Sequence, residues 1–257
     1  MSRLSPYFQY LCHDKYGIHL HIEWTNPMKR NLRILMLGFV LIPPLLTHAQ
    51  QPSQEPAAHL NRRIKHFSVT DATMLDAVSE LSQSEPAAFH FGFEEILVEK
   101  WGDKQQVQFS VNLNNASVKE ILDTLCQYDS RYTWSIDGAT VNIYPRAAAD
   151  DPHYLPNLKI SKIALTDLRN AYSVFGPLEK VLPPGEQLGY MGMGGDTNYP
   201  TPWTAELEDI TVRQLVNRAA EHMGPQSSWV FHGSKSDRFF GFHKGWFRKA
   251  SAKPSHT

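Results

Sequence analysis

Apolar side chains recur at helical spacing in four stretches of the chain. Each stretch places apolar residues at positions i, i+3, i+4 and i+7, which is typical of a helix with one face against a core. The first two stretches begin 44 positions apart, at Met74 and Val118, and the last two repeat this spacing from Leu168 to Val212. We therefore expect four helices in two pairs. The four sets are Met74, Ala77, Val78 and Leu81; Val118, Ile121, Leu122 and Leu125; Leu168, Ala171, Tyr172 and Phe175; and Val212, Leu215, Val216 and Ala219.

The second helix of each pair begins with a capping signal. Ser117 with Glu120, and Thr211 with Gln214, fit the capping box. In this motif a hydroxyl accepts the N–H of the third helical residue, whose side chain reaches back to the cap. The signals predict helix starts at 118 and 212.

Around the helices the apolar period changes to two, which is typical of half-buried strands. Each pair of helices also precedes an aromatic hairpin, the first with a predicted two-residue turn at Asp137-Gly138. The hairpin arms carry Trp134, Ile136, Val141 and Ile143 in the first copy, and Trp229, Phe231, Phe240 and Phe242 around Gly233 in the second. Further strands are expected at Phe67–Val69, Phe89–Phe93, 107–113 (Val107, Phe109, Val111, Leu113), Ile160–Ile163 and 203–207 (Trp203, Ala205, Leu207).

The order of these elements predicts an α+β protein built from two similar β-α-β-β-α-β-β units. Each unit packs two helices on a small sheet. We expect the first domain at 64–145 and the second at 158–246, with a Pro- and Asp-containing linker at 146–157. The common offset between the copies predicts a tandem duplication.

The run Val111–Pro145 resembles the secretin and TonB short N-terminal (STN) domain. Its shared features are a strand, a small polar cap, an amphipathic helix, an aromatic strand, a Gly turn and a closing strand. The preceding segment FSVTDATMLDAVSELSQ is similar to the opening strand and helix of that domain. The second unit shares the resemblance only through the internal repeat. The family comprises bacterial periplasmic modules of secretins and TonB-dependent receptors, so the resemblance implies a protein that docks other proteins.

The N-terminal region predicts export. Lys29, Arg30 and Arg33 precede an uncharged apolar run from Ile34 to Leu46, and small residues follow at Thr47–Ala49. This order is typical of a secretory signal peptide at 28–49, cleaved near Ala49-Gln50, and the apolar run is too short to span a membrane. The expected location is therefore periplasmic or secreted. Residues 1–27 read as a mis-annotated upstream extension, 50–63 as a flexible leader, and 247–257 as a polar tail.

Composition narrows the function further. The formal charge of −1 and the pI of about 6.9 disfavour nucleic acid as a partner. The sequence predicts no integral membrane span in the mature chain, and two cysteines, Cys12 and Cys126, rule out a dense disulfide framework.

The sequence gives only weak signals for catalytic or metal-binding residues. Glu94 and Glu95 are adjacent, so on a strand they point to opposite faces. We expect His232 and His243 to face solvent without binding a metal, and Cys126 to be a small core residue. The sequence therefore predicts no enzyme, no metal and no cofactor. The alternative is a periplasmic hydrolase or glycan-binding protein with an unrecognised site.

The candidate partner-binding residues lie in the Pro- and Gly-rich segment 177–202. Aromatic and methionine side chains are favoured in contact surfaces. The expected partners are envelope proteins, among them secretin or TonB-linked components, and the oligomeric state stays open. The alternative is a disordered insertion without a contact role. The candidate residues are Tyr190, Met191, Met193 and Tyr199.

Overall fold

The computed structural model describes most of the chain from residue 59 to residue 244. The predicted upstream extension at 1–27, the signal peptide at 28–49, most of the leader and the tail at 247–257 lie outside the described residues. The last leader residues are structured, because Leu60 packs against a core and the first strand already begins at Arg63. The described ranges are 59–84, 89–99, 106–184, 186, 188–191, 196–234 and 237–244.

The protein is α+β, as predicted. In both halves a strand, a helical segment, two strands, a helix and a hairpin follow one another, which is the order that the sequence predicts. A duplication would account for this shared order, and the duplication itself remains a prediction. The elements of the first half are β1 (Arg63–Ala72), α2 (Met74–Ser84), β2 (His90–Glu94), β3 (Phe109–Ser117), α3 (Val118–Tyr128), β4 (Tyr132–Asp137) and β5 (Thr140–Pro145). Those of the second half are β6 (Lys159–Asn170), η3 (Ala171–Val174), α4 (Phe175–Glu179), β7 (Gly189–Tyr190), β8 (Asn198–Thr211), α5 (Val212–His222), β9 (Ser227–Gly233) and β10 (Arg238–Lys244).

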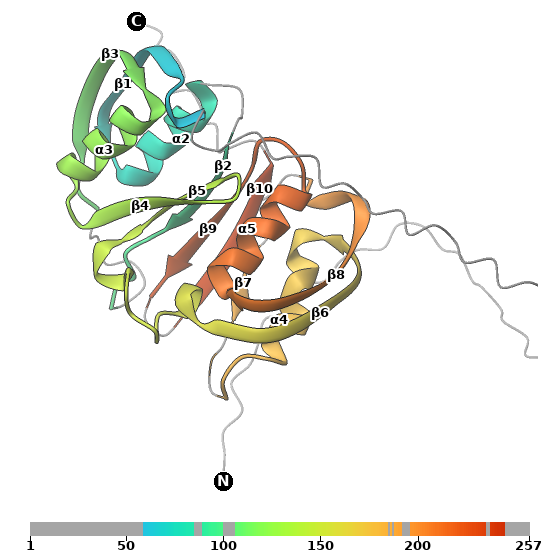
Figure 1. The fold of residues 1–257 in the computed structure, drawn as a ribbon. Helices are drawn as coiled ribbons and strands as arrows, with labels where there is room; N and C mark the ends of the chain where they lie inside the picture. Colours follow the sequence, from blue (N-terminus) through green and yellow to red (C-terminus); the bar gives the residue numbers. More distant parts are fainter. Residues whose placement is uncertain are drawn as a thin grey trace, which may run out of the picture. The chain divides into compact units, whose positions relative to one another are not determined.

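One six-stranded sheet runs through both halves, in the order β4-β5-β2-β9-β10-β7 (Figure 1). Its central step is the parallel pairing of β2 with β9, in which Phe91 lies opposite Ser228 and Glu94 opposite Phe231. The hairpins β4–β5 and β9–β10 are antiparallel, whereas β2–β5 and β7–β10 are parallel. The two halves are therefore joined by backbone hydrogen bonds as well as by side chains.

The sheet separates two hydrophobic cores. On one face Phe91 and Phe93 of β2 join α2 and α3 in the first core, and Val230 of β9 reaches into the same core. On the other face Trp229 and Phe231 of β9 pack beneath α5 in the second core. Because side chains alternate along a strand, one strand such as β9 serves both cores.

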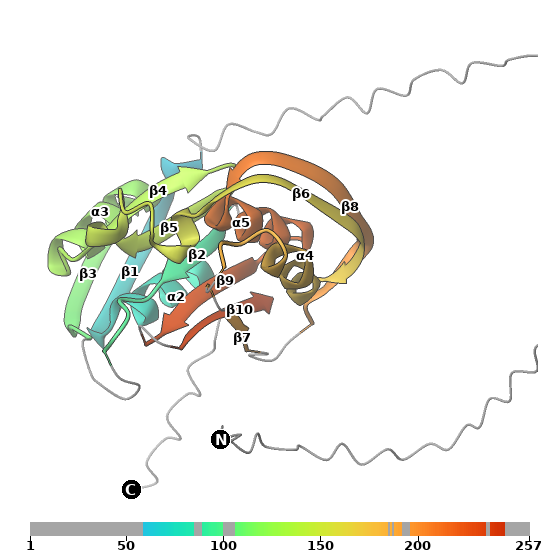
Figure 2. The same ribbon diagram turned by 90° about the horizontal axis from the view of Figure 1, so that it is seen from below.

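Each half also contains a two-stranded antiparallel ribbon, β1–β3 or β6–β8. The second ribbon curves around α4 and α5 (Figure 2). Both ribbons have an irregularity at an Asp with positive φ, 48° at Asp71 and 50° at Asp167. The Asp N–H donates to a hydroxyl across the ribbon at 3.0 Å, that of Ser110 in the first half and of Thr204 in the second. The same local device therefore bends both ribbons.

Both predicted capping boxes are present. The Ser117 hydroxyl accepts the N–H of Glu120, and the Thr211 hydroxyl accepts the N–H of Gln214. In each box the side chain of the later residue accepts the N–H of the cap in return. The helices at 118–128 and 212–222 therefore start where the sequence places them, and the helix at 74–84 also starts at its predicted residue, Met74.

The third predicted helix starts later than its apolar stripe indicates. Leu168 belongs to β6, where it pairs with Trp203 across the ribbon, and the chain turns helical only after the cap at Asn170. A 3₁₀ turn and the short α4 follow. Leu168 is buried because it lies on a strand, and the buried residues after it lie on the helical segment. The helical spacing in the sequence therefore combined residues of two different elements.

Two further details differ from the sequence-based expectation. Asp137 pairs with Thr140, so the two-residue turn of the first hairpin is Gly138-Ala139 and not Asp137-Gly138. Gly138 has a φ of +58°, the conformation that favours glycine in such a turn. Val107 lies just before β3 and is exposed.

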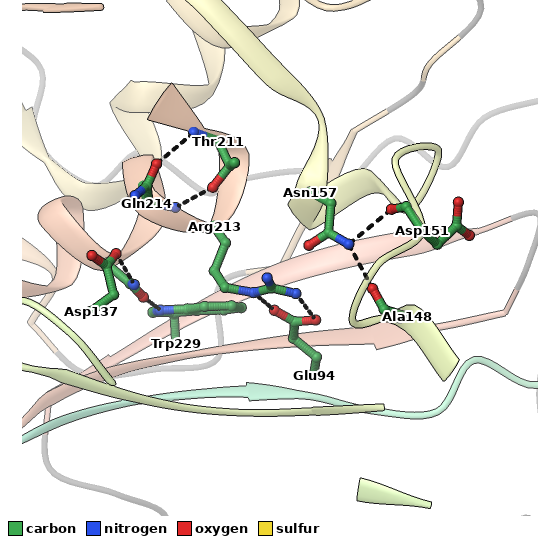
Figure 3. A network of polar contacts seen from close by, with 10 residues as sticks. Glu94, Asp137, Ala148, Asp151, Asn157, Thr211, Arg213, Gln214 and Trp229 are labelled. Atoms are coloured by element: carbon green, nitrogen blue, oxygen red, sulfur yellow. Dashed lines mark hydrogen bonds and ion pairs between the residues drawn. The ribbon is translucent and has the colours of Figure 1, made fainter. Parts of the chain in front are cut away.

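The predicted linker 146–157 is well packed where it meets the second half. It contains two 3₁₀ turns, Arg146–Ala148 and Leu155–Asn157. Leu155 is buried in the second core, and the amide of Asn157 donates to the carbonyls of Ala148 and Asp151 (Figure 3). Its assignment as a domain boundary remains a prediction.

Candidate functional site: the sheet joint and its edges

A buried ion pair crosses the joint between the two halves. Nε of Arg213, on α5, donates to Oε1 of Glu94 at 2.5 Å, and Nη2 donates to Oε2 at 2.9 Å (Figure 3). The Glu94 side chain is fully buried, and the guanidinium also lies 4.4 Å from the ring centroid of Tyr144 on β5. Burial raises the pKa of Glu94, and the ion pair opposes this shift. A bidentate pair fixes α5 against the end of β2.

Neighbouring polar contacts extend the joint from α5 to the first hairpin. The indole N–H of Trp229 donates to Oδ1 of Asn217 at 2.7 Å, and the Asn217 amide donates to Asp137 at 3.0 Å. Glu221 accepts the hydroxyl of Thr140 at 2.9 Å and the N–H of Ala139 at 3.1 Å. These contacts hold hairpin β4–β5 of the first half against the helix of the second.

Gly92 allows the Trp229 ring to lie across β2. A Cβ atom at this position would lie 2.5 Å from two atoms of the indole and 2.6 Å from Oδ1 of Asn142. Both neighbours are completely buried and held by strands, so neither has room to move. The joint therefore needs a residue without a side chain at position 92.

The outer strand β7 and the residue after it present two of the four predicted partner-binding residues. Tyr190 is 56% exposed and Met191 is 38% exposed. The ring of Tyr190 stacks on Phe175 with a centroid distance of 5.5 Å and an interplanar angle of 10°. The backbone of Met191 donates to Phe240, and its carbonyl accepts the hydroxyl of Tyr172 at 2.8 Å. The ring of Tyr190 and the backbone of Met191 are thus held in place.

Of the other two predicted residues, Tyr199 does not join this surface. Tyr199 is only 8% exposed, since β8 turns its ring into the second core against His222 and Trp203. Met193 lies outside the described residues. The sequence patterns did not single out the joint residues Arg213 and Gly92; the glycine between two phenylalanines in β2 was a signal for the joint.

The remaining polar candidates make structural contacts. Glu94 and Glu95 do point apart, and Glu95 accepts the Gln106 amide at 3.1 Å in a small hollow that Asp129 and Arg131 also line. Asp129 and Arg131 are themselves an ion pair at 2.7 Å. Burial raises the pKa of Glu95 and raises that of Cys126 to about 11, so the thiol is protonated at neutral pH.

The expectation that His243 faces solvent is wrong. His243 pairs with Ser228 and His232 with Phe239, and His243 is only 3% exposed. The face of β9–β10 away from the second core is therefore covered as well. Burial, with a smaller contribution from His232, lowers the pKa of His243 to about 4, so the imidazole is neutral at neutral pH.

Within the described ranges no helix is long and apolar enough to cross a membrane. Comparison of the chain with family models, with curated proteins and with solved structures finds no match. The resemblance to the STN domain therefore depends on the sequence pattern of 67–145 and on the order of elements alone.

Proposed function

We propose that the protein is an exported, non-catalytic module that docks another protein of the cell envelope, as the resemblance to STN domains implies. The observation that carries the proposal is the β7 surface, defined here as Tyr190 and Met191. It combines a sheet edge with an exposed aromatic ring that is packed against Phe175 and an exposed methionine whose backbone is hydrogen-bonded. Rigid aromatic residues give contact area at a low entropic cost, and edge strands offer backbone groups to a partner.

The buried polar network supports a structural role for the joint. Its side chains form hydrogen bonds between the halves, and these side chains are Arg213, Glu94, Asn217 and Glu221. Such a joint holds the edges of the sheet at fixed positions relative to one another. That geometry suits a docking module, in which a partner recognises a preformed surface.

Affinity capture from envelope extract tests the docking proposal. The bait is the mature chain, and the variant Tyr190→Ala removes the exposed ring of the β7 surface. Tyr128→Ala is a matched control, because Tyr128 is 53% exposed and stacks on Phe109 at 5.7 Å in the first half. We expect an envelope protein that the wild type and Tyr128→Ala retain and that Tyr190→Ala loses. Equal retention by all three baits removes the β7 surface from the proposal.

Export has a separate test. Cell fractionation with N-terminal sequencing should find the protein outside the cytoplasm with Gln50 as its first residue. A cytoplasmic product that retains residues 28–49 would contradict export.

A further inference from the structure

Strand β4 forms the other edge of the six-stranded sheet, and β5 is its one strand neighbour in the described part of the chain. Residues of an antiparallel pair alternate between exchanging backbone hydrogen bonds and pointing them outward. In a hairpin with a two-residue turn the closing pair, here Asp137 and Thr140, is hydrogen-bonded. The backbone groups of Trp134 and Ile136 therefore point away from β5, toward the edge.

The second half contains the same arrangement with its edge occupied. Trp229 and Phe231 hold the places on β9 that Trp134 and Ile136 hold on β4, since Trp229 pairs with Phe242 as Trp134 pairs with Ile143. Their backbone groups face β2, as shown by the 2.8 Å bond from the N–H of Glu95 to the carbonyl of Phe231. Strand β2 thus shows what an added strand looks like at this type of edge.

The two tryptophans differ in how far they are covered. Each indole N–H donates to the adjacent helix, Trp134 to Asp123 of α3 at 2.9 Å and Trp229 to Asn217 of α5 at 2.7 Å. Trp229 is fully buried, because β2 passes beside it with Gly92 below the ring. Trp134 is only partly buried. Its ring therefore marks a position where a strand with a small residue fits.

A basic residue stands at the same place on both helices. Arg213 is the second residue of α5 and binds Glu94, which lies two residues after Gly92 on the same face of β2. Lys119 is the second residue of α3. Its side chain is 55% exposed and its charge meets Asp123 within the same helix. On a strand added to β4 in the same way, an acidic side chain two residues after the glycine would lie next to Lys119.

We propose that the β4 edge binds an extended segment of a partner protein, which adds to the sheet as a strand parallel to β4. The segment has a glycine beneath Trp134 and, two residues later, an acidic side chain beside Lys119. This site is distinct from the β7 surface and goes beyond the proposed function. A second copy of the chain is the poorer occupant. Its outer strand β7 would be the strand that adds to β4. Tyr190 of β7 pairs with β10 as Phe91 of β2 pairs with β5. The next residue is Met191 in β7's segment but Gly92 in β2, so a methionine would stand where the glycine is needed.

A peptide with the sequence of residues 89–95, FHFGFEE, is the probe, since it contains the segment that β9 binds. Its binding to the full chain is measured by fluorescence polarisation, and the bound site is mapped by NMR on the backbone amides. We expect saturable binding that perturbs Trp134 and Ile136. Replacing the peptide glycine by valine should weaken binding about tenfold or more, because the extra methyl groups collide with the indole.

Protein variants sharpen the test. Lys119→Glu should weaken binding by about three- to tenfold, through charge repulsion. Lys159→Glu, the same charge change at the exposed start of β6, should leave binding unchanged, as should Tyr190→Ala on the β7 surface. A peptide that fails to bind overturns this proposal and leaves docking through β7 standing.

Other outcomes also contradict the proposal. Equal affinity of the glycine and valine peptides would show non-specific apolar binding. Perturbation of Trp229 and Phe231 in place of the β4 amides would show exchange with β2. Self-association of the chain that the peptide blocks would replace the partner protein by a second copy.

Discussion

Hairpins β4–β5 and β9–β10 are built alike and end in different surroundings. Each carries a tryptophan that donates to the preceding helix, at Trp134 and at Trp229. In the second half β2 lies against the hairpin and Trp229 is buried, whereas in the first half β4 is the edge of the sheet. The same sequence pattern therefore forms a joint where a strand with a glycine lies beside it and an open edge where no described strand does.

The largest effect is expected from Arg213→Met, which leaves Glu94 buried without its partner. Breaking a buried ion pair costs about 3–5 kcal/mol, and urea unfolding at pH 7 should show a loss of this size. With the opposing charge removed, burial raises the folded-state pKa of Glu94 further above its unfolded value. The loss should therefore be smallest below about pH 4 and grow as the pH rises through the folded-state pKa. A loss independent of pH would contradict this origin.

Gly92→Ala should destabilise the protein by about 1–3 kcal/mol, because the new methyl group overlaps the Trp229 ring. Gly176→Ala is the matched control, since a Cβ there meets nothing within 4 Å. Its unfolding midpoint should stay the same or rise. Equal midpoints for both variants would remove Gly92 from the joint.

Replacing each tryptophan by phenylalanine compares the two hairpins directly. Trp229→Phe should cost about 2 kcal/mol, because it leaves the buried Oδ1 of Asn217 without its donor. Trp134→Phe should cost about 1 kcal/mol or less, since Asp123 is partly exposed and water replaces the indole. Chemical unfolding of both variants checks the order, and a larger loss for Trp134→Phe would reverse the comparison.

The smallest effect is expected from Lys119→Met, the counterpart of Arg213→Met. The Lys119–Asp123 pair is solvent-exposed, and exposed pairs within a helix contribute about 0.5 kcal/mol or less. Thermal unfolding should therefore barely change. A loss of stability comparable to that of Arg213→Met would show that Lys119 already forms a buried ion pair within the chain.

Local patterns predicted much of each half. The apolar stripes and capping boxes predicted the starts of α2, α3 and α5, and the alternation of Trp229, Phe231, Phe240 and Phe242 predicted the two arms of hairpin β9–β10. These features depend on residues close in sequence. The start of the helical segment after β6 was misplaced, because Leu168 is buried through a distant ribbon partner, Trp203.

The joint and the exposure of single side chains could not be predicted in the same way. The β2–β9 pairing brings together strands from opposite halves, and no local period encodes it. The sequence signal for this pairing was the glycine between Phe91 and Phe93. It can be interpreted only when the position of Trp229 above the glycine is known. Tyr199 was predicted at a contact surface because its segment is rich in Pro and Gly, yet β8 carries it into the second core.

Amide hydrogen exchange tests most directly that one sheet joins the halves and leaves β4 as its edge. The backbone N–H groups of Trp229 and Phe231 face β2, and those of Trp134 and Ile136 face outward. The former should exchange slowly, with protection that approaches the global stability, while the latter should exchange orders of magnitude faster. Equal protection at all four positions, or fast exchange at Trp229 and Phe231, would contradict the account.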